Sequence, residues 1–286
     1  MKKYLYLILL CLSVTASLAQ SAPPRLIIRG DDMGYSHSGN LALIKCFKEG
    51  VQTSIEIIVP SPWFPEAVVM LNQNPTADVG IHLAITSEWD NIKWRPVSHC
   101  PSIVNDDGYF YPMVFPNKNY PGQSISESKW NIADIEKEFR AQIEMALKKI
   151  PRISHISSHM NCTNLSPEVA AMTRKLSKEY KIDIDPGELG VEYVGYGSGV
   201  HKTFEEKLDS FLAMLSSLQQ GKTYLFVDHP GLNDEELKAV SHIGYEDVAV
   251  DRQGVTDLFT NVKVGSMIRQ KGIQLVSYKD IAKSKH

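Results

Sequence analysis

The chain of 286 residues is poor in cysteine and has no strong excess of either charge. Its four cysteines contain no CxxC pair, so their spacing does not indicate a cysteine zinc site. Beyond Cys11, two interpretations of Cys46, Cys100 and Cys162 remain open: one disulfide with a spare thiol, or three buried free thiols. The formal charge of −3 argues against nucleic acid or an anionic membrane surface as a partner.

No apolar run is long enough to span a bilayer, so we expect no stable membrane anchor. The apolar run over residues 4–14 follows two lysines and precedes small residues that end at Ala19, an order typical of a secretory signal peptide. We therefore predict a signal peptide over residues 1–19 and one catalytic domain over residues 20–286. Cleavage would make the chain more acidic, and the mature protein is expected to be exported, to the periplasm or outside the cell.

The chain also lacks internal repeats and low-complexity linkers, which favours a single domain of α/β barrel size. Apolar runs alternate with helical patterns, as in βαβ units with a parallel sheet. Strands are expected at 26–29, 53–59, 78–83, 153–156, 224–227 and 274–276, with a brief apolar run at 182–184. Helices are expected at 38–48, 62–71, 131–150, 167–179, 204–218 and 256–269. The pattern predicts an α/β fold, a distorted (β/α) barrel of about seven strands, with its chemistry at the carboxyl ends of the strands.

Two segments show no sustained period. Residues 85–128 are rich in Trp, Pro, Asn, Asp and Tyr, and residues 186–201 contain five glycines. The first is longer than ordinary connections inside a compact domain, which indicates a loop that covers a substrate site. The second is expected to be a flexible loop.

Two adjacent carboxylates, Asp31 and Asp32, follow the first expected strand and precede Gly34. Consecutive side chains at a strand end point in different directions, so one carboxylate can bind a cation while the other accepts a proton. The alternative is an ordinary turn in which Asp and Gly serve the backbone.

Three histidines, His82, His159 and His229, stand at or just after other expected strand ends. One carboxylate and two imidazoles, with positions left for water, suit a catalytic divalent cation. Imidazole favours zinc, although magnesium or another divalent ion stays open. Such an ion acidifies water, a second carboxylate can take its proton, and a further histidine can protonate a leaving group. These are the parts of a metal-dependent hydrolase. A lone histidine after a strand is more often structural, and His155 is expected to bond the backbone.

Five segments resemble, in order, the YdjC-like carbohydrate deacetylases. Gly30-Asp31-Asp32-Met33-Gly34 is similar to the family's Ala-Asp-Asp-Phe-Gly, and Val51-Gln52-Thr53-Ser54 to its Gly-Ile-x-Thr-Ser. Gly80-Ile81-His82-Leu83 matches Gly-x-His-Leu. Asp107-Gly108-Tyr109-Phe110 resembles Asp-Gly-x-Phe, and Asp228-His229-Pro230-Gly231 resembles Cys-His-Pro-Gly. Arg252 and residues 272–278 are similar to the family's closing region.

The resemblance implies a distorted (β/α) barrel that removes acetyl groups from N-acetylated sugars or oligosaccharides. It implies that Asp32, His82 and His159 are the metal ligands and that Asp31 is the catalytic base. His229 would then be the acid that protonates the departing amine.

The chain departs from this family in the stretch Thr-His-Leu-Asp-Ser-His-x-His-x-His. The first histidine of the triple is His159, while Asn161 and Thr163 replace the later two and Ser157 replaces the aspartate. Partners of this kind orient metal ligands, so metal affinity or substrate preference is expected to differ. A basic residue of the family near residues 181–185 is also missing, where this chain has two aspartates.

Other assignments remain open at this point. The protein could be another secreted metal-dependent amide or ester hydrolase, a sugar isomerase, or a catalytically degenerate barrel that only binds glycans. Four aromatic residues of the long loop either pack against sugar faces or anchor the loop: Trp89, Trp94, Tyr109 and Tyr111.

Overall fold

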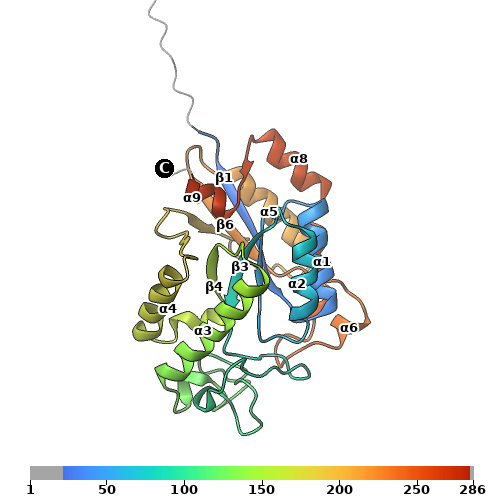
Figure 1. Cartoon of the computed structure of the whole chain (residues 1–286). Helices are drawn as coiled ribbons and strands as arrows, with labels where there is room; N and C mark the ends of the chain where they lie inside the picture. The colour runs from blue at the N-terminus through green and yellow to red at the C-terminus, as the bar shows by residue number, and fades with distance from the viewer. Residues whose placement is uncertain (1–21, 284–286) are drawn as a thin grey trace, which may run out of the picture.

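A computed structural model describes residues 22–283, and its seven strands form one curled parallel sheet (Figure 1). The predicted signal peptide, residues 1–19, lies outside the described range. The strands are β1 (Arg25–Met33), β2 (Ser54–Ile57), β3 (Asp78–Leu83), β4 (His155–Ser158), β5 (Glu192–Val194), β6 (Thr223–Asp228) and β7 (Gln274–Leu275). Their order is β4-β3-β2-β1-β6-β5, with β7 paired to β1, so the half-barrel is open between its edge strands β4 and β5.

Helices surround this sheet and connect its strands. The α-helices are α1 (His37–Glu49), α2 (Phe64–Gln73), α3 (Ile132–Lys149), α4 (Pro167–Glu179), α5 (Phe204–Ser217), α6 (Glu235–Lys238), α7 (Val248–Phe259), α8 (Val262–Gln270) and α9 (Tyr278–Lys283). Short 3₁₀ turns are η1 (Pro101–Ile103), η2 (Ile125–Glu127) and η3 (His159–Asn164). Side-chain caps explain where several helices begin: Ser36, Asn131 and Ser166 each accept a hydrogen bond from the third residue beyond them.

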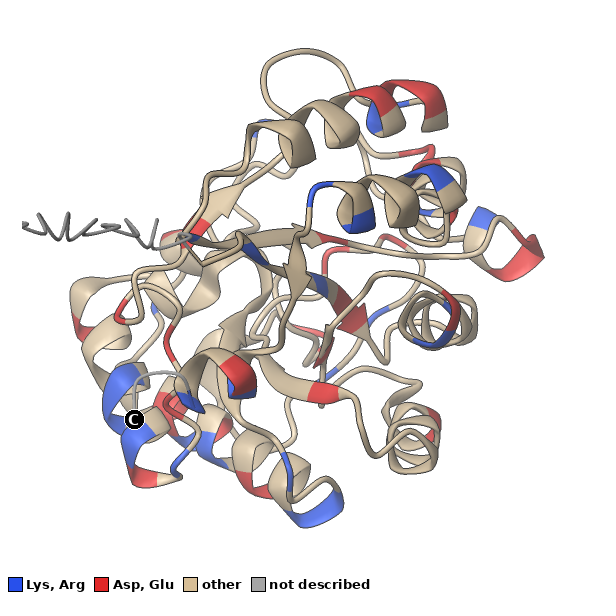
Figure 2. Cartoon of the chain, turned by 90° about the horizontal axis from the view of Figure 1, so that it is seen from above, with Lys and Arg blue, Asp and Glu red and all other residues tan. Residues whose placement is uncertain are grey.

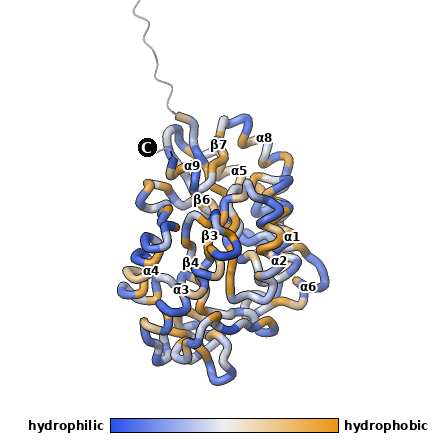
Figure 3. The backbone as a smooth tube through the Cα atoms, in the orientation of Figure 1, coloured by the Kyte–Doolittle hydropathy of each residue, from blue (hydrophilic) through white to orange (hydrophobic). Residues whose placement is uncertain are grey.

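Alternation along β1 separates two layers of core. Leu26 and Ile28 pack with Phe226 against the helices, whereas Ile27 packs with Tyr278 inside the curled sheet. Hydrophobic and hydrophilic residues alternate along the outer helices, as expected for one apolar face (Figure 3). Both signs of charge are spread over these helices (Figure 2). Among residues 22–283 no helix is long and apolar enough to cross a membrane.

The α/β prediction, a distorted barrel of about seven strands, is confirmed. The strand at 78–83 and the helix at 167–179 have the predicted bounds, and residues 85–128 hold only η1, η2 and irregular chain. The three cysteines of the described residues are buried free thiols, the second of the two interpretations above.

Two element predictions were wrong. The helix expected at 256–269 is two helices, because Asn261 caps a new helix by accepting a hydrogen bond from the amide of Lys263. The flexible loop expected at 186–201 contains β5, a strand of three residues held by its register with β6. So short a strand, set among glycines, leaves no periodic signal in the sequence.

Candidate metal centre and active site

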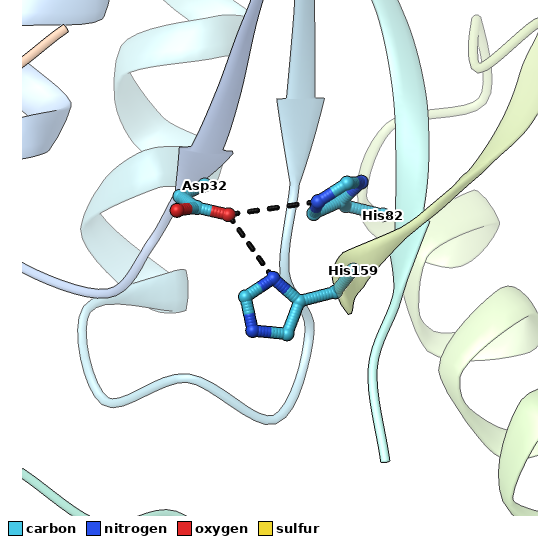
Figure 4. A group of neighbouring side chains, drawn as sticks. All are labelled: Asp32, His82 and His159. Carbon is cyan, nitrogen blue, oxygen red and sulfur yellow. Dashed lines mark ion pairs between the residues drawn. The ribbon is translucent and has the colours of Figure 1, made fainter. Parts of the chain in front are cut away.

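The carboxyl ends of β1, β3 and β4 bring three predicted ligands to one point (Figure 4). Asp32 Oδ1 lies 3.2 Å from His159 Nδ1 and 3.5 Å from His82 Nε2. One ligand atom from each of these buried residues lies within 4.8 Å of the other two. Parallel strands explain the convergence, because their carboxyl ends meet at the same edge of the sheet.

The backbone beside two of these residues is held in an unusual conformation. Asp32 has a φ of 72°, and Met160 and Asn161, directly after His159, have φ values of 48° and 62°. The register between β1 and β2 also shifts between Gly30 and Met33. Left-handed backbone is costly for residues other than glycine and tends to cluster at functional sites. Here it turns Asp31 and Asp32 toward different partners.

His82 is held from within the sheet. Its Nδ1 lies 2.7 Å from Ser157 Oγ, and these two residues pair in register across β3 and β4. Burial lowers the pKa of His82 to about 4. The ring is therefore neutral at neutral pH, as a metal ligand must be.

His159 is held by a residue of the long loop. Its Nε2 lies 3.0 Å from Glu88 Oε2, so Nδ1 is the nitrogen that faces Asp32. Burial opposes the charged form, but the carboxylates of Glu88 and Asp32 outweigh it and raise the pKa of His159 to about 10. His159 therefore carries a proton in the absence of metal, and a bound cation would replace that proton on Nδ1. Sequence reasoning missed Glu88. Its only signal was an acidic residue in the irregular segment that follows the strand of His82.

The second oxygen of Asp32 has its own cationic partner. Arg252 of α7 donates from Nη2 to Asp32 Oδ2 at 2.8 Å, and its guanidinium lies over the rings of Tyr35 and Trp89. Burial opposes ionisation of Asp32, but His229 and Arg252 hold the pKa of this carboxyl well below its usual range. Asp32 thus carries a negative charge that the site is built to keep.

The donor set fits a divalent cation. Within the described part of the chain, Asp32 Oδ1 is buried and has no hydrogen-bond partner, although two imidazole nitrogens face it. A buried carboxylate oxygen without a hydrogen-bond donor is unfavourable unless a cation binds to it. One carboxylate and two imidazoles are ligand types that zinc and similar ions accept. Asp32, His82 and His159 could therefore hold a metal ion.

Asp31 and His229 both lie close to this group. Asp31 accepts two hydrogen bonds from Arg29, at 2.7 and 2.9 Å, and its Oδ2 lies 3.7 Å from His82 Nε2. His229 Nε2 lies 3.9 Å from Asp32 Oδ2, and this side chain is 40% exposed. Burial opposes its charge, but Asp32 and Asp228 outweigh burial and raise the pKa of His229. The structure thus brings all five predicted site residues together: the three candidate ligands, a carboxylate held by Arg29, and a partly exposed histidine.

The structure contradicts one further expectation about a side chain and decides between two interpretations of another pair. His155 bonds the side chains of Ser154 and Glu56 instead of the backbone, and it stacks on Tyr278. Trp89 and Trp94 are 1% and 3% exposed, which favours anchoring the loop over presenting a face to a sugar. Tyr109 and Tyr111 remain half-buried.

A cavity of about 480 Å³ adjoins the site at the open side of the half-barrel. Arg29 and Ser157, which contact Asp31 and His82, line it together with Asp183 and Asp185. The two aspartates noted as a departure from the family pattern therefore face this cavity.

Known proteins are similar to this chain in sequence and in fold. The family described as YdjC-like protein matches residues 25–270. A carbohydrate deacetylase of Clostridium beijerinckii is 30% identical over 270 residues, covering 90% of this chain and all of that protein. One from Enterococcus faecalis is 26% identical over 273 residues, covering 90% of this chain and 98% of the relative. The crystal structure of a cellobiose-phosphate cleavage protein from Enterococcus faecalis has the same fold, with a TM-score of 0.71, 24% identity and coverage of 91% and 99%. With a match that spans nearly all of the described chain, this protein belongs to the YdjC-like family.

Proposed function

We propose that this protein removes acetyl groups from N-acetylated sugars or oligosaccharides with the help of a bound divalent cation. The predicted enzyme class, a carbohydrate deacetylase, is confirmed by the family and by its curated relatives. The observation that carries the cation-dependent mechanism is the convergence of Asp32, His82 and His159, with a donor-free carboxylate oxygen between two imidazoles.

The residues around the ligands have complementary tasks. A divalent cation, preferably zinc, would be held by Asp32, His82 and His159 and would supply a Lewis acid that acidifies water and polarises the acetamide carbonyl. Asp31 takes the proton of the attacking water, and its two bonds from Arg29 keep the carboxylate in place. His229, whose raised pKa favours the protonated form, donates a proton to the amine nitrogen as the C–N bond breaks. The products are acetate and the free amine.

The test compares Asp31→Asn with His82→Ala and His159→Ala. Metal content and acetate release from a panel of N-acetylated oligosaccharides are measured on each purified variant. Asp31→Asn should keep its metal and lose turnover, whereas either histidine variant should lose both. Asp257→Asn, an exposed carboxylate on α7, is the matched control and should behave as the wild type. A fully active Asp31→Asn would remove the base from this mechanism.

The same panel decides between the proposal and its rivals. A metal-loaded protein that releases no acetate from any N-acetylated glycan would instead be an amide or ester hydrolase of another kind, or a sugar isomerase. Tight glycan binding without metal would indicate a binding module.

We also propose that the protein acts outside the cytoplasm, where it meets its glycan, on the basis of the sequence of residues 1–19. Mass analysis of the protein after expression in a bacterial host should show a chain that begins at Gln20. Recovery of the uncleaved chain from the cytoplasm would overturn export.

A further inference from the structure

Glu56 is a fully buried carboxylate that the mechanism above does not use. It lies on β2, one strand away from His82, and it is 0% exposed. Its Oε1 accepts hydrogen bonds from His155 Nε2 at 2.8 Å and from Ser54 Oγ at 3.1 Å. Its Oε2 accepts one from Ser157 Oγ at 2.6 Å. Burying a carboxylate so deeply is unfavourable unless every partner is in place, so its location needs an explanation.

The sheet makes room for this carboxylate. Glu56 pairs in register with Gly80 on β3, and His155 on β4 pairs with Gly80 from the other side. A Cβ at position 80 would overlap both Glu56 Oε2 and His155 Nε2. Only glycine at this position lets the carboxylate and the imidazole meet inside the half-barrel.

The protons along this path can be assigned from donor and acceptor capacity. Burial opposes the charge of Glu56, but His155 and Arg29 lower the pKa of this carboxyl to about 2, so it is ionised and only accepts hydrogen bonds. The single proton of the Ser157 hydroxyl points to Glu56 Oε2 at 2.6 Å, because the carbonyl of Ile81 lies farther away at 3.5 Å. Ser157 Oγ must then accept from His82 Nδ1, which lies 2.7 Å away. With its proton on Nδ1, His82 presents the lone pair of Nε2 toward Asp32 Oδ1, where a cation fits.

We propose that Glu56, acting through Ser157, is a positioning residue that fixes the tautomer and ring orientation of His82 for metal binding. The proposal rests on the metal site of the proposed function. It also accounts for Ser157, which stands where the family resemblance leads one to expect an aspartate. In this chain the carboxylate comes from the neighbouring strand β2, and a serine hydroxyl spans the remaining distance to the ligand.

The experiment measures the zinc dissociation constant of metal-free protein by competition with a chromophoric chelator. Ser157→Ala removes the hydroxyl that links Glu56 to His82 and leaves the hydrogen bonds of Glu56 to His155 and Ser54. This variant should bind zinc about 10- to 100-fold more weakly. Glu56→Gln should weaken it to a similar extent. The double variant should bind no more weakly than Ser157→Ala alone, because the two residues act in series.

Glu138→Gln is the matched control. Glu138 on α3 is equally buried, and among the described residues it accepts hydrogen bonds from Ser98 and Gln142 and from none of the candidate ligands. Its zinc affinity should stay within about twofold of the wild type. Ser157→Asp in the Glu56→Gln background places a carboxylate beside Nδ1 of His82 and should restore zinc affinity. If Glu56 had only a structural role, Ser157→Asp would not restore zinc affinity.

Zinc affinity unchanged in Ser157→Ala, or fully additive losses in the double variant, would overturn the proposal. If Glu56→Gln does not fold, Ser157→Ala still decides the question. Wild type that binds zinc but releases no acetate would refute the proposed function and leave this positioning role intact. Wild type that binds no zinc would overturn the positioning role itself.

Discussion

His82 and His159 face the same oxygen of Asp32, but different kinds of structure hold them. His82 lies within β3, and its support comes from strands, first Ser157 and then Glu56. His159 follows β4, and its Nε2 contacts Glu88 from the irregular segment 85–128. We call these the strand side and the loop side of the site. The barrel itself builds one half of the candidate metal centre, and a loop without regular structure completes the other.

The two sides also differ in electrostatics. The neighbour of His82 Nδ1 is a neutral hydroxyl, and burial dominates, which lowers the pKa of this histidine to about 4. His159 lies between two carboxylates that outweigh burial and raise its pKa to about 10. On the strand side, burial therefore keeps the ring of His82 neutral. On the loop side, the carboxylate of Glu88 adds a negative charge that would attract a cation.

The largest expected difference between the two sides is in stability. Glu56→Ala removes the acceptor of three buried hydrogen bonds and should lower the free energy of unfolding by about 3–5 kcal/mol. Glu88→Ala removes the acceptor of one and should lower it by about 1–2 kcal/mol. Urea denaturation of the metal-free proteins measures both. Equal losses in the free energy of unfolding would contradict this prediction, because the two carboxylates would then stabilise the fold to the same extent.

A smaller effect, on metal binding alone, is expected from Glu88→Gln. The amide keeps the shape of the side chain but loses the charge that orients His159, so zinc affinity should fall about tenfold with little change in the unfolding midpoint. Glu127→Gln, an exposed carboxylate in the same irregular segment, is the control and should bind zinc normally. If Glu88→Gln leaves the affinity intact, the loop side plays no part in holding the ligand.

Arg252 connects the two sides, because its guanidinium bonds Asp32 and lies over Trp89 of the loop. Arg252→Lys keeps the charge and loses the flat face over Tyr35 and Trp89, so the protein should lose about 1–2 kcal/mol of stability. Arg174→Lys, at an exposed position of α4, should change stability by less than about 0.5 kcal/mol. Thermal unfolding followed by circular dichroism compares the two. A loss no greater than the control's would mean that stacking contributes nothing here.

The two histidine ligands, one on each side, were predictable from the sequence, whereas the carboxylates that support them, Glu56 and Glu88, were not. Asp32, His82 and His159 sit at the ends of recognisable apolar runs, and parallel strands bring such ends together. Glu88, by contrast, reaches His159 across 71 residues of sequence from a segment without periodicity. Glu56 looked like one more residue of a strand, because only the register with Gly80 shows that it points at Ser157. Local patterns fix the elements, whereas partners that meet through tertiary packing leave no local signal.

The smallest expected effect concerns the three thiols, which test whether the loop opens independently of the strands. Burial raises the pKa of Cys46, Cys100 and Cys162 to about 12 each, so little thiolate exists at pH 8. Cys162 donates to the carbonyl of Leu83 at the end of β3, while Cys100 belongs to the irregular segment. Local opening of that segment should expose Cys100 first.

Labelling with a thiol reagent, followed by mass analysis of peptides, measures this order. Cys100 should react slowly, and Cys46 and Cys162 more slowly still, at the rate of global unfolding. Protein unfolded in urea provides the control, since all three thiols should then react together. Labelling of Cys162 as fast as Cys100 in the native protein would mean that β3 and the loop open as one unit, which would remove the distinction between the two sides of the site.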